Sequence, residues 1–375
     1  MWKALLVLFV CLTASAQELH PILALGARAP DFSLPGVDGK THTLAEYAAS
    51  PVLVIVFTCN HCPIAQMYEQ RIEHLATEYG PRGVAVVAIQ PNDPKAIRID
   101  ELDSSDVSDS LPEMKIRVQM KHLTYPYLYD GETQQVARAY GPQATPHVFI
   151  FDRERHLQYE GRIDNSYRTE LVKTHDAEDA IRALLNHQPV KVRHTGVFGC
   201  STKWQEKSLA SAEALQKIDD TPVTLELASK AELARLRTNP SHQLMLVDFW
   251  ATWCGSCRVE FADLQNTLRM YADRDLSFVT VSTNMPDEKP SVLKFLEKQH
   301  ATSRNLLFDS SDTTGLQTAF DPTWDSAVPY TVLLSGDGRV LYKTTGSVDI
   351  LALRRTILAN LPASYAGFRK YWQQN

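Results

Sequence analysis

The chain has 375 residues, of which 44% are hydrophobic and 22% are charged, and its formal net charge is −6 at pH 7. At roughly 150 residues per domain, this length predicts two or three domains, and we expect two cores. The ordinary composition excludes a disordered chain, and the negative net charge without a basic patch argues against a nucleic-acid partner.

The first 16 residues have the pattern of an export signal. Lys3 precedes an apolar run at 4–12, and residues 14–16 (Ala-Ser-Ala) have the small-x-small pattern of a signal-peptidase site. We expect cleavage after residue 16 and a secreted or periplasmic protein. The apolar run is shorter than the about 20 residues that cross a bilayer, so we expect no stable membrane span after cleavage.

The first half of the chain alternates between strand and helix patterns. Short apolar runs predict buried strands, and apolar stripes at helical spacing predict helices. A polar stretch at 91–120 is expected to loop out. The expected elements are strands at 51–57, 83–91, 147–152 and 157–163, and helices at 64–80, 133–141 and 176–188.

The second half repeats this order, which indicates a duplicated architecture. Its expected helices are at 229–237, 257–273, 289–299 and 350–361, and its expected strands are at 244–250, 276–283, 330–335 and 339–346. The region between the halves is too regular in pattern to be a bare flexible linker. We therefore expect a signal peptide at 1–16, a first domain at 17–188, a connecting segment at 189–222, a second domain at 223–362 and a C-terminal tail at 363–375.

Five cysteines remain after the signal, as two close pairs and one single residue. Cys59 and Cys62 follow the strand at 51–57, Cys254 and Cys257 follow the strand at 244–250, and Cys200 stands alone. A pair two residues apart closes too small a loop to stabilise a fold. Thiol-disulfide exchange is therefore a more natural role for each pair than a structural one.

The second pair lies between a predicted strand and a predicted helix. At a helix N-terminus, unpaired backbone N–H groups and the helix dipole stabilise a thiolate, which is the form of cysteine that attacks a disulfide. The outer cysteine is then an exposed nucleophile, and the inner one, a helical turn on, resolves the mixed disulfide. A structural zinc site is the weaker interpretation, because zinc takes four ligands and no second pair is nearby.

The stretch "LMLVDFWATWCGSCRVEF" resembles thioredoxin, and residues 223–361 are similar to the exported TlpA-like branch of that family. The resemblance implies that Cys254 is the attacking thiol and Cys257 the resolving thiol. It implies that Trp253 is the flanking aromatic residue and that Asp248 is a buried carboxylate that handles protons near the inner cysteine. Pro329 occupies the place of the cis-proline that receives the substrate backbone.

The first half resembles the peroxiredoxin-like AhpC/TSA-type redoxins over roughly residues 25–204, on the motifs "APDFSLPGVDGK", "CNHCP" and "ATPHVFIFD". The last motif supplies Pro146 as the cis-proline counterpart. Together the two resemblances imply an α/β protein with two tandem thioredoxin-like folds, each a central mixed sheet flanked by helices.

The two pairs differ in the residues around them. Six residues before Cys59 stands Leu53, whereas six before Cys254 stands Asp248, so the first pair lacks the buried carboxylate. His61 lies between the first two cysteines, where a cationic imidazole favours a thiolate at Cys59 and so a more oxidising pair. The alternative is that His61 is a solvated loop side chain.

These observations predict an exported thiol-disulfide oxidoreductase with two CxxC sites. Its expected partners are protein thiols and disulfides and an upstream electron donor, with electron relay between the domains as a further hypothesis, and we expect no cofactor and no bound metal.

Three alternatives stay open. A thiol-dependent peroxidase would be reduced by the C-terminal domain, although Thr58 before Cys59 lacks the proline of the peroxidatic motif. A Cu(I)-binding redox protein would use Cys59, Cys62 and His61, since thiolates and imidazole suit that ion. Cys200 is either a third redox thiol or a buried, inert cysteine.

Overall fold

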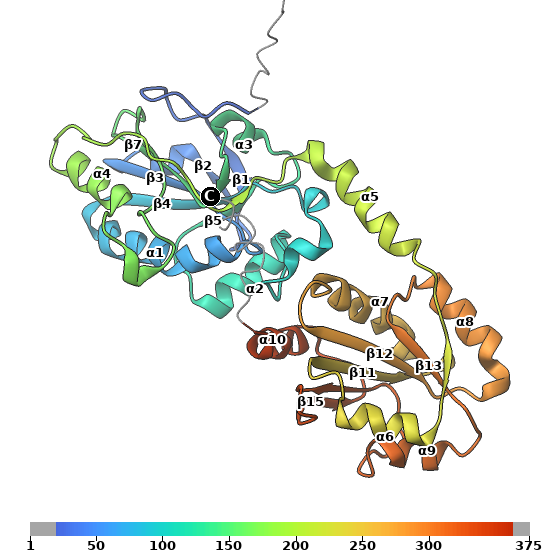
Figure 1. Cartoon of the computed structure of the whole chain (residues 1–375). Coiled ribbons are helices and arrows are strands. Elements are labelled where there is room, and N and C mark those ends of the chain that lie inside the picture. The colour runs from blue at the N-terminus through green and yellow to red at the C-terminus, as the bar shows by residue number, and fades with distance from the viewer. Residues whose placement is uncertain (1–19, 363–375) are drawn as a thin grey trace, which may run out of the picture.

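The computed structural model describes residues 20–362, so the expected signal peptide and C-terminal tail lie outside the described residues. The chain forms two α/β units, one with a five-stranded sheet and one with a six-stranded sheet. Figure 1 shows the units in blue to green and in yellow to red, joined by helix α5 (Ser208–Asp219). Within residues 20–362, no helix has the length and apolar character that crossing a membrane requires.

The first unit has the strand order β5-β4-β3-β7-β8, with β3, β4 and β5 parallel and β7 and β8 antiparallel to their neighbours. All six residues of β3 are buried, because apolar clusters cover both faces of the sheet. The strands are β3 (Val52–Phe57), β4 (Val84–Gln90), β5 (Tyr127–Tyr129), β7 (His147–Phe151) and β8 (Leu157–Gly161), and the helices are α1 (Pro63–Tyr79), α2 (Leu111–Lys121), α3 (Gln135–Tyr140) and α4 (Asp176–Leu185).

Two short strand pairs complete this unit. Strand β1 (Ser33–Pro35) pairs with β2 (Thr41–Thr43), and β6 (Ala144–Thr145) pairs with β9 (Cys200–Ser201). The second pairing joins the residues before Pro146 to a segment that follows α4 by some distance in the chain. It therefore brings the single cysteine back to the sheet that carries the first pair.

The second unit has the strand order β10-β13-β12-β11-β14-β15. Helices α7 and α10 share one apolar cluster with the sheet, and α6 and α9 share another on its opposite face. The strands are β10 (Glu226–Ala228), β11 (Leu244–Trp250), β12 (Leu276–Ser282), β13 (Arg304–Phe308), β14 (Tyr330–Leu334) and β15 (Val340–Thr345), and the helices are α6 (Lys230–Thr238), α7 (Gly255–Met270), α8 (Lys289–Lys298), α9 (Thr313–Phe320) and α10 (Ile350–Asn360).

The predicted fold class is confirmed, with two mixed sheets flanked by helices, but the polar stretch at 91–120 does not loop out as expected. It contains two short 3₁₀ turns and most of helix α2, and its side chains Ser105, Asp106 and Asp109 are almost fully buried. These groups can be buried because each one is hydrogen-bonded or ion-paired inside the fold. The stretch therefore belongs to the packed structure of the first unit.

Part of the expected connecting segment packs on the first sheet. Glu160 of β8 bridges to His194, and Cys200 of β9 pairs with Thr145. Only after Trp204 does the chain leave through α5 towards the second unit. The boundaries at 188/189 and 222/223 stay a prediction.

The two units touch through the 99–106 segment of the first. The Tyr271 hydroxyl donates to the Ser105 carbonyl at 2.9 Å, and the Arg355 guanidinium lies 2.8 Å from the Asp106 carboxylate. Tyr271 follows the C-terminal end of α7, whereas Cys254 precedes its N-terminal end. A helix of 16 residues is about 24 Å long, so the second cysteine pair lies at the far end of α7 from this contact.

We predict that this contact sets how the units dock. Replacing both Arg355 and Arg274 with Ala removes an ion pair to Asp106 and a hydrogen bond to the Asp103 carbonyl, each worth about 1 kcal/mol at a partly exposed site. The expected result is a larger radius of gyration in solution scattering, with unchanged helix content. Arg354→Ala is the control, because Arg354 bonds Thr267 within the second unit. An unchanged radius in the double variant contradicts the prediction.

Candidate active sites

The first cysteine pair lies where strand β3 turns into helix α1. Cys62 is the N-cap of α1 and Pro63 is its first residue, which suits proline because that position needs no N–H donor. Both thiols are free, but Cys59 is only 2% exposed and Cys62 is 0% exposed. Both are buried because the 104–110 segment and Thr145 pack against the turn.

Thr145 contacts both thiols. Its hydroxyl lies 3.1 Å from Cys59 Sγ, and its carbonyl oxygen lies 3.5 Å from Cys62 Sγ. The peptide bond between Thr145 and Pro146 is cis. The structure thus places Pro146 directly after the residue that touches the cysteines, and its role in receiving substrate stays a prediction.

His61 is buried and forms an ion pair with Asp109. Its Nδ1 lies 2.7 Å from Asp109 Oδ2, and Asp109 Oδ1 accepts the backbone N–H groups of Asn60 and His61 at 2.9 and 3.0 Å. Asn92 Nδ2 donates to Asp109 Oδ2 at 2.9 Å. The interpretation of His61 as a solvated loop side chain is therefore wrong, since only 1% of the residue is exposed.

The ion pair keeps His61 cationic. Burial acts to lower the pKa of His61, but the charge and hydrogen bond of Asp109 outweigh it, so the pKa is raised. Burial acts to raise the pKa of Asp109, and the charge and hydrogen bonds of His61 outweigh this effect, so that pKa is lowered. Both shifts favour the charged forms, which is what a buried pair needs in order to stay ionised.

The thiolate is favoured at Cys62 and not at Cys59. Burial, a hydrogen bond to Cys62 and the negative charge of Asp109 raise the pKa of Cys59. Burial also acts to raise the pKa of Cys62, but hydrogen bonds from Cys200 and Cys59 and the charge of His61 hold it well below its usual value. The prediction that His61 favours a thiolate at Cys59 is therefore wrong, because burial raises the pKa of Cys59, and the hydrogen bond to Cys62 and the charge of Asp109 raise it further.

A metal could be held by ligand atoms of Cys59, His61 and Asp109, which lie within 4.8 Å of one another. Cys62 is outside this group, so the copper ligand set expected from the sequence is not preassembled. Asp109 already accepts four hydrogen bonds, and a metal would have to displace some of them. The carboxylate is better suited to orienting His61 than to binding an ion.

We predict that Asp109→Asn raises the pKa of Cys62. Without the carboxylate, burial and the charge of Lys203 act to lower the pKa of His61 and only the charge of Cys62 opposes them, so the neutral form is favoured and the cation that supports the Cys62 thiolate is lost. Ultraviolet thiolate absorbance should titrate about one pH unit higher or more in the variant, measured with Cys254 and Cys257 oxidised. Asp100→Asn is the control, because Asp100 pairs with Arg98 in the same segment. Equal titration midpoints in Asp109→Asn and wild type would refute the conclusion that the His61–Asp109 pair supports the Cys62 thiolate.

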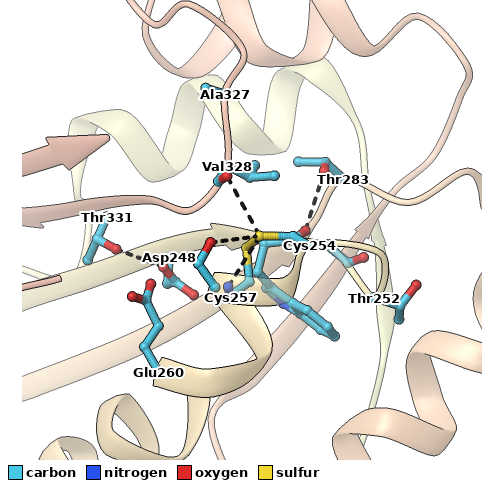
Figure 2. Close-up of a disulfide and its surroundings, with 12 residues drawn as sticks. Asp248, Thr252, Cys254, Cys257, Glu260, Thr283, Ala327, Val328 and Thr331 are labelled. Carbon is cyan, nitrogen blue, oxygen red and sulfur yellow. Dashed lines mark hydrogen bonds between the residues drawn. A yellow bond between two sulfur atoms is a disulfide. The ribbon is translucent and has the colours of Figure 1, made fainter. Parts of the chain in front are cut away.

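The second pair is a disulfide at the start of helix α7. Cys254 is the N-cap, and its Sγ accepts the backbone N–H of Cys257 at 3.2 Å. Figure 2 shows the Val328 carbonyl facing Cys254, at 3.6 Å from its Sγ, and the following bond to Pro329 is cis. Trp253 is 66% exposed, but Cys254 beside it is only 6% exposed, so the expectation of an exposed outer cysteine is wrong for this pair. This surface is the place where a partner chain can approach the disulfide.

Asp248 lies in the middle of β11 and is 1% exposed. Burial raises its pKa to about 7, against a hydrogen bond from Thr331 at 2.8 Å and with a further contribution from the charge of Glu260. Figure 2 shows Asp248, Thr331 and Glu260 together on one side of the disulfide. The group can therefore exchange a proton near neutral pH, which is what a general acid or base needs.

We predict that Asp248→Asn stabilises the chain increasingly as pH rises. In the folded wild type the carboxyl stays protonated to about pH 7, whereas in the unfolded chain it ionises near 3.8, so wild-type stability falls between these values. Between pH 4 and pH 8 the free energy of unfolding of the variant, relative to wild type, should rise by up to about 4 kcal/mol. Urea unfolding of the second unit at both values checks this, and a pH-independent difference contradicts it.

Sequence reasoning missed two carboxylates. Asp109 is 47 residues beyond Cys62, in a stretch expected to loop out, and no local pattern links it to His61. Glu260 follows Cys257 by three residues on α7, so helical spacing could have identified it as a neighbour of the disulfide. The prediction that the first site lacks a strand carboxylate agrees with the structure, since Leu53 is buried in β3.

The comparisons with known proteins follow this division of the chain. Residues 25–160 match the AhpC/TSA family, and residues 217–353 match the Redoxin family. The chain is 29% identical over 108 residues to the "Thiol:disulfide interchange protein DsbE" of Allochromatium vinosum, covering 28% of this chain and 54% of that protein. It is 26% identical over 133 residues to the "Thiol-disulfide oxidoreductase ResA" of Geobacillus thermodenitrificans, covering 35% and 65%.

Among solved structures, a hypothetical protein from Sinorhizobium meliloti 1021 is 35% identical over 50% of this chain and 97% of its own, with a TM-score of 0.44. A putative thiol:disulfide interchange protein DsbE from Chlorobium tepidum is 21% identical over 44% and 99%, with a TM-score of 0.34. The chain spans between about half and two thirds of the curated relatives it matches.

The fold and the two cysteine sites define a tandem thioredoxin-fold protein. The chain carries an AhpC/TSA-type domain followed by a Redoxin-type domain.

Proposed function

We propose that the protein is an exported thiol-disulfide oxidoreductase with two active CxxC sites that act on protein thiols and disulfides. The observation that carries the proposal is the Cys254–Cys257 disulfide at a helix N-terminus, beside a buried carboxyl of pKa about 7 and an exposed tryptophan. The names of the curated relatives support it, and the signal pattern at 1–16 supports export.

At the second site, the reduced Cys254 attacks a substrate disulfide as thiolate and forms a mixed disulfide, and one substrate sulfur leaves as thiolate and is protonated. Cys257 then loses its proton to Asp248 and attacks Cys254, which releases the second substrate thiolate and restores the Cys254–Cys257 disulfide. Two electrons pass to the substrate in each cycle. A thiol donor of suitable potential must therefore reduce the pair again.

At the first site, the buried thiols accept or donate a disulfide through the Cys62 thiolate that His61 supports. The elevated pKa of Cys59 argues against the peroxidase alternative, because peroxide is attacked by a thiolate. The copper alternative is disfavoured because its ligand set is not preassembled, since Cys62 lies outside the group that Cys59, His61 and Asp109 form. The proposed domains at 17–188 and 223–362 each contain one pair.

Relay between the pairs is the finer part of the proposal. In the docked arrangement the second pair lies at the end of α7 that points away from the 99–106 contact, so the units serve separate partners there. A relay requires the units to separate and to turn about the segment that contains α5. Docking and relay are thus alternative states of the same chain.

We predict that Cys254→Ser abolishes reduction of a protein disulfide such as insulin by the dithiothreitol-charged protein, to below about one tenth of the wild-type rate. Cys59→Ser should keep most of this activity, because the two sites act separately in the docked state. The rate of insulin precipitation measures both. Insulin reduction that needs Cys59 but not Cys254, or equal activity in wild type and both variants, contradicts the proposed roles. Consumption of hydrogen peroxide that requires Cys59 would favour the peroxidase alternative.

A further inference from the structure

The single cysteine, Cys200, is held against the first site by a close backbone contact. In strand β9 it pairs with Thr145, the residue before Pro146. The preceding Gly199 has φ +154°, and a Cβ there would lie 2.0 Å from the Thr145 carbonyl oxygen. Only glycine permits this approach, so Gly199 allows the chain to place Cys200 next to the Cys59 and Cys62 thiols.

Cys200 contacts Cys62 through its backbone. Its N–H donates to Cys62 Sγ at 3.3 Å, and the two thiols shift each other's pKa. Cys59 and Cys62 shift each other's pKa in the same way. Cys62 therefore lies between two thiols, and either could become its disulfide partner.

The three cysteines differ in exposure. Cys59 and Cys62 are 2% and 0% exposed, whereas Cys200 is partly exposed. A thiol or disulfide of a protein partner can approach Cys200 more easily than either residue of the CxxC pair. The buried pair thus has a neighbour that reaches the surface.

We propose that Cys200 is a third redox thiol, which takes over the disulfide of the first site and passes it to partners. This inference rests on the proposed exchange function of that site. The Cys200 thiolate attacks Cys62 Sγ of the Cys59–Cys62 disulfide, a Cys62–Cys200 bond forms, and Cys59 leaves as thiolate. Cys59 takes up a proton for the one that Cys200 lost, and no net oxidation occurs.

The charges around the cluster support this order of events. In the reduced cluster the hydrogen bond to Cys62 is the main cause that raises the pKa of Cys200, followed by burial. A disulfide-bonded Cys62 carries no charge, so that cause disappears when the first pair is oxidised. When a partner thiolate then attacks Cys200 Sγ, the leaving group is Cys62. Its thiolate loses the Cys200 thiol as a donor but keeps the Cys59 thiol and the charge of His61, which lower its pKa, and low-pKa thiols leave faster.

Peptide mapping by mass spectrometry tests the linkage. The full chain is equilibrated in a glutathione redox buffer, alkylated and digested without reduction. We expect both Cys59–Cys62 and Cys62–Cys200 linkages in wild type, and the Cys62–Cys200 linkage alone at this site in Cys59→Ser. A wild type with only the Cys59–Cys62 linkage, together with a Cys59→Ser variant in which Cys62 carries only glutathione, overturns the inference.

Reduction kinetics test the role, with Cys200→Ser against the control Ser201→Ala on the same strand. We expect reduction of the oxidised first site by a protein dithiol such as thioredoxin to slow by about tenfold or more in Cys200→Ser and to stay unchanged in the control. Equal rates overturn the inference but leave the exchange function of the CxxC pair standing. That function itself fails if no Cys59–Cys62 disulfide forms in either wild type or Cys200→Ser.

Discussion

The ion pair between His61 and Asp109 is the interaction on which the first site depends. The Asp109 carboxylate accepts hydrogen bonds from two backbone N–H groups of the active-site turn, from the imidazole, which it orients, and from the Asn92 side chain. Without it, a buried imidazole would lose its charge and the segment that contains Asp109 would lose its main bond to the turn. The placement of the thiolate at Cys62 follows from the cation that this pair maintains.

The segment that contains Asp109 also contacts the second unit. It therefore takes part both in the first cysteine site and in the docking of the two units. Residues 99–106 accept bonds from Tyr271, Arg274 and Arg355, while Asp109 a few positions later bonds His61. The second site handles its proton differently: Asp248 has no cationic partner among residues 20–362, and burial raises its pKa to about 7. One fold thus supports a thiolate by a buried cation in one unit and a proton acceptor of neutral pKa in the other.

Much of this could be predicted from the sequence, because the informative signals are local. The runs at 51–57 and 244–250 predict buried strands, Pro63 marks the start of α1, and the CxxC spacing places both pairs at helix N-termini. Strand β13 and helix α9 are short and were missed. The burial of Cys59, the role of Asp109 and the thiolate at Cys62 were not accessible, since each depends on contacts between residues tens of positions apart.

The central claim is that the two environments give the pairs different redox properties, and the reduction potential of each pair tests it most directly. The protein is equilibrated in graded thiol buffers and alkylated, and the state of each cysteine peptide is measured. A thiolate stabilised at Cys62 favours the reduced form, so the first pair should be the more oxidising by at least about 30 mV, which corresponds to about one pKa unit. Equal potentials, or a more reducing first pair, would contradict the account.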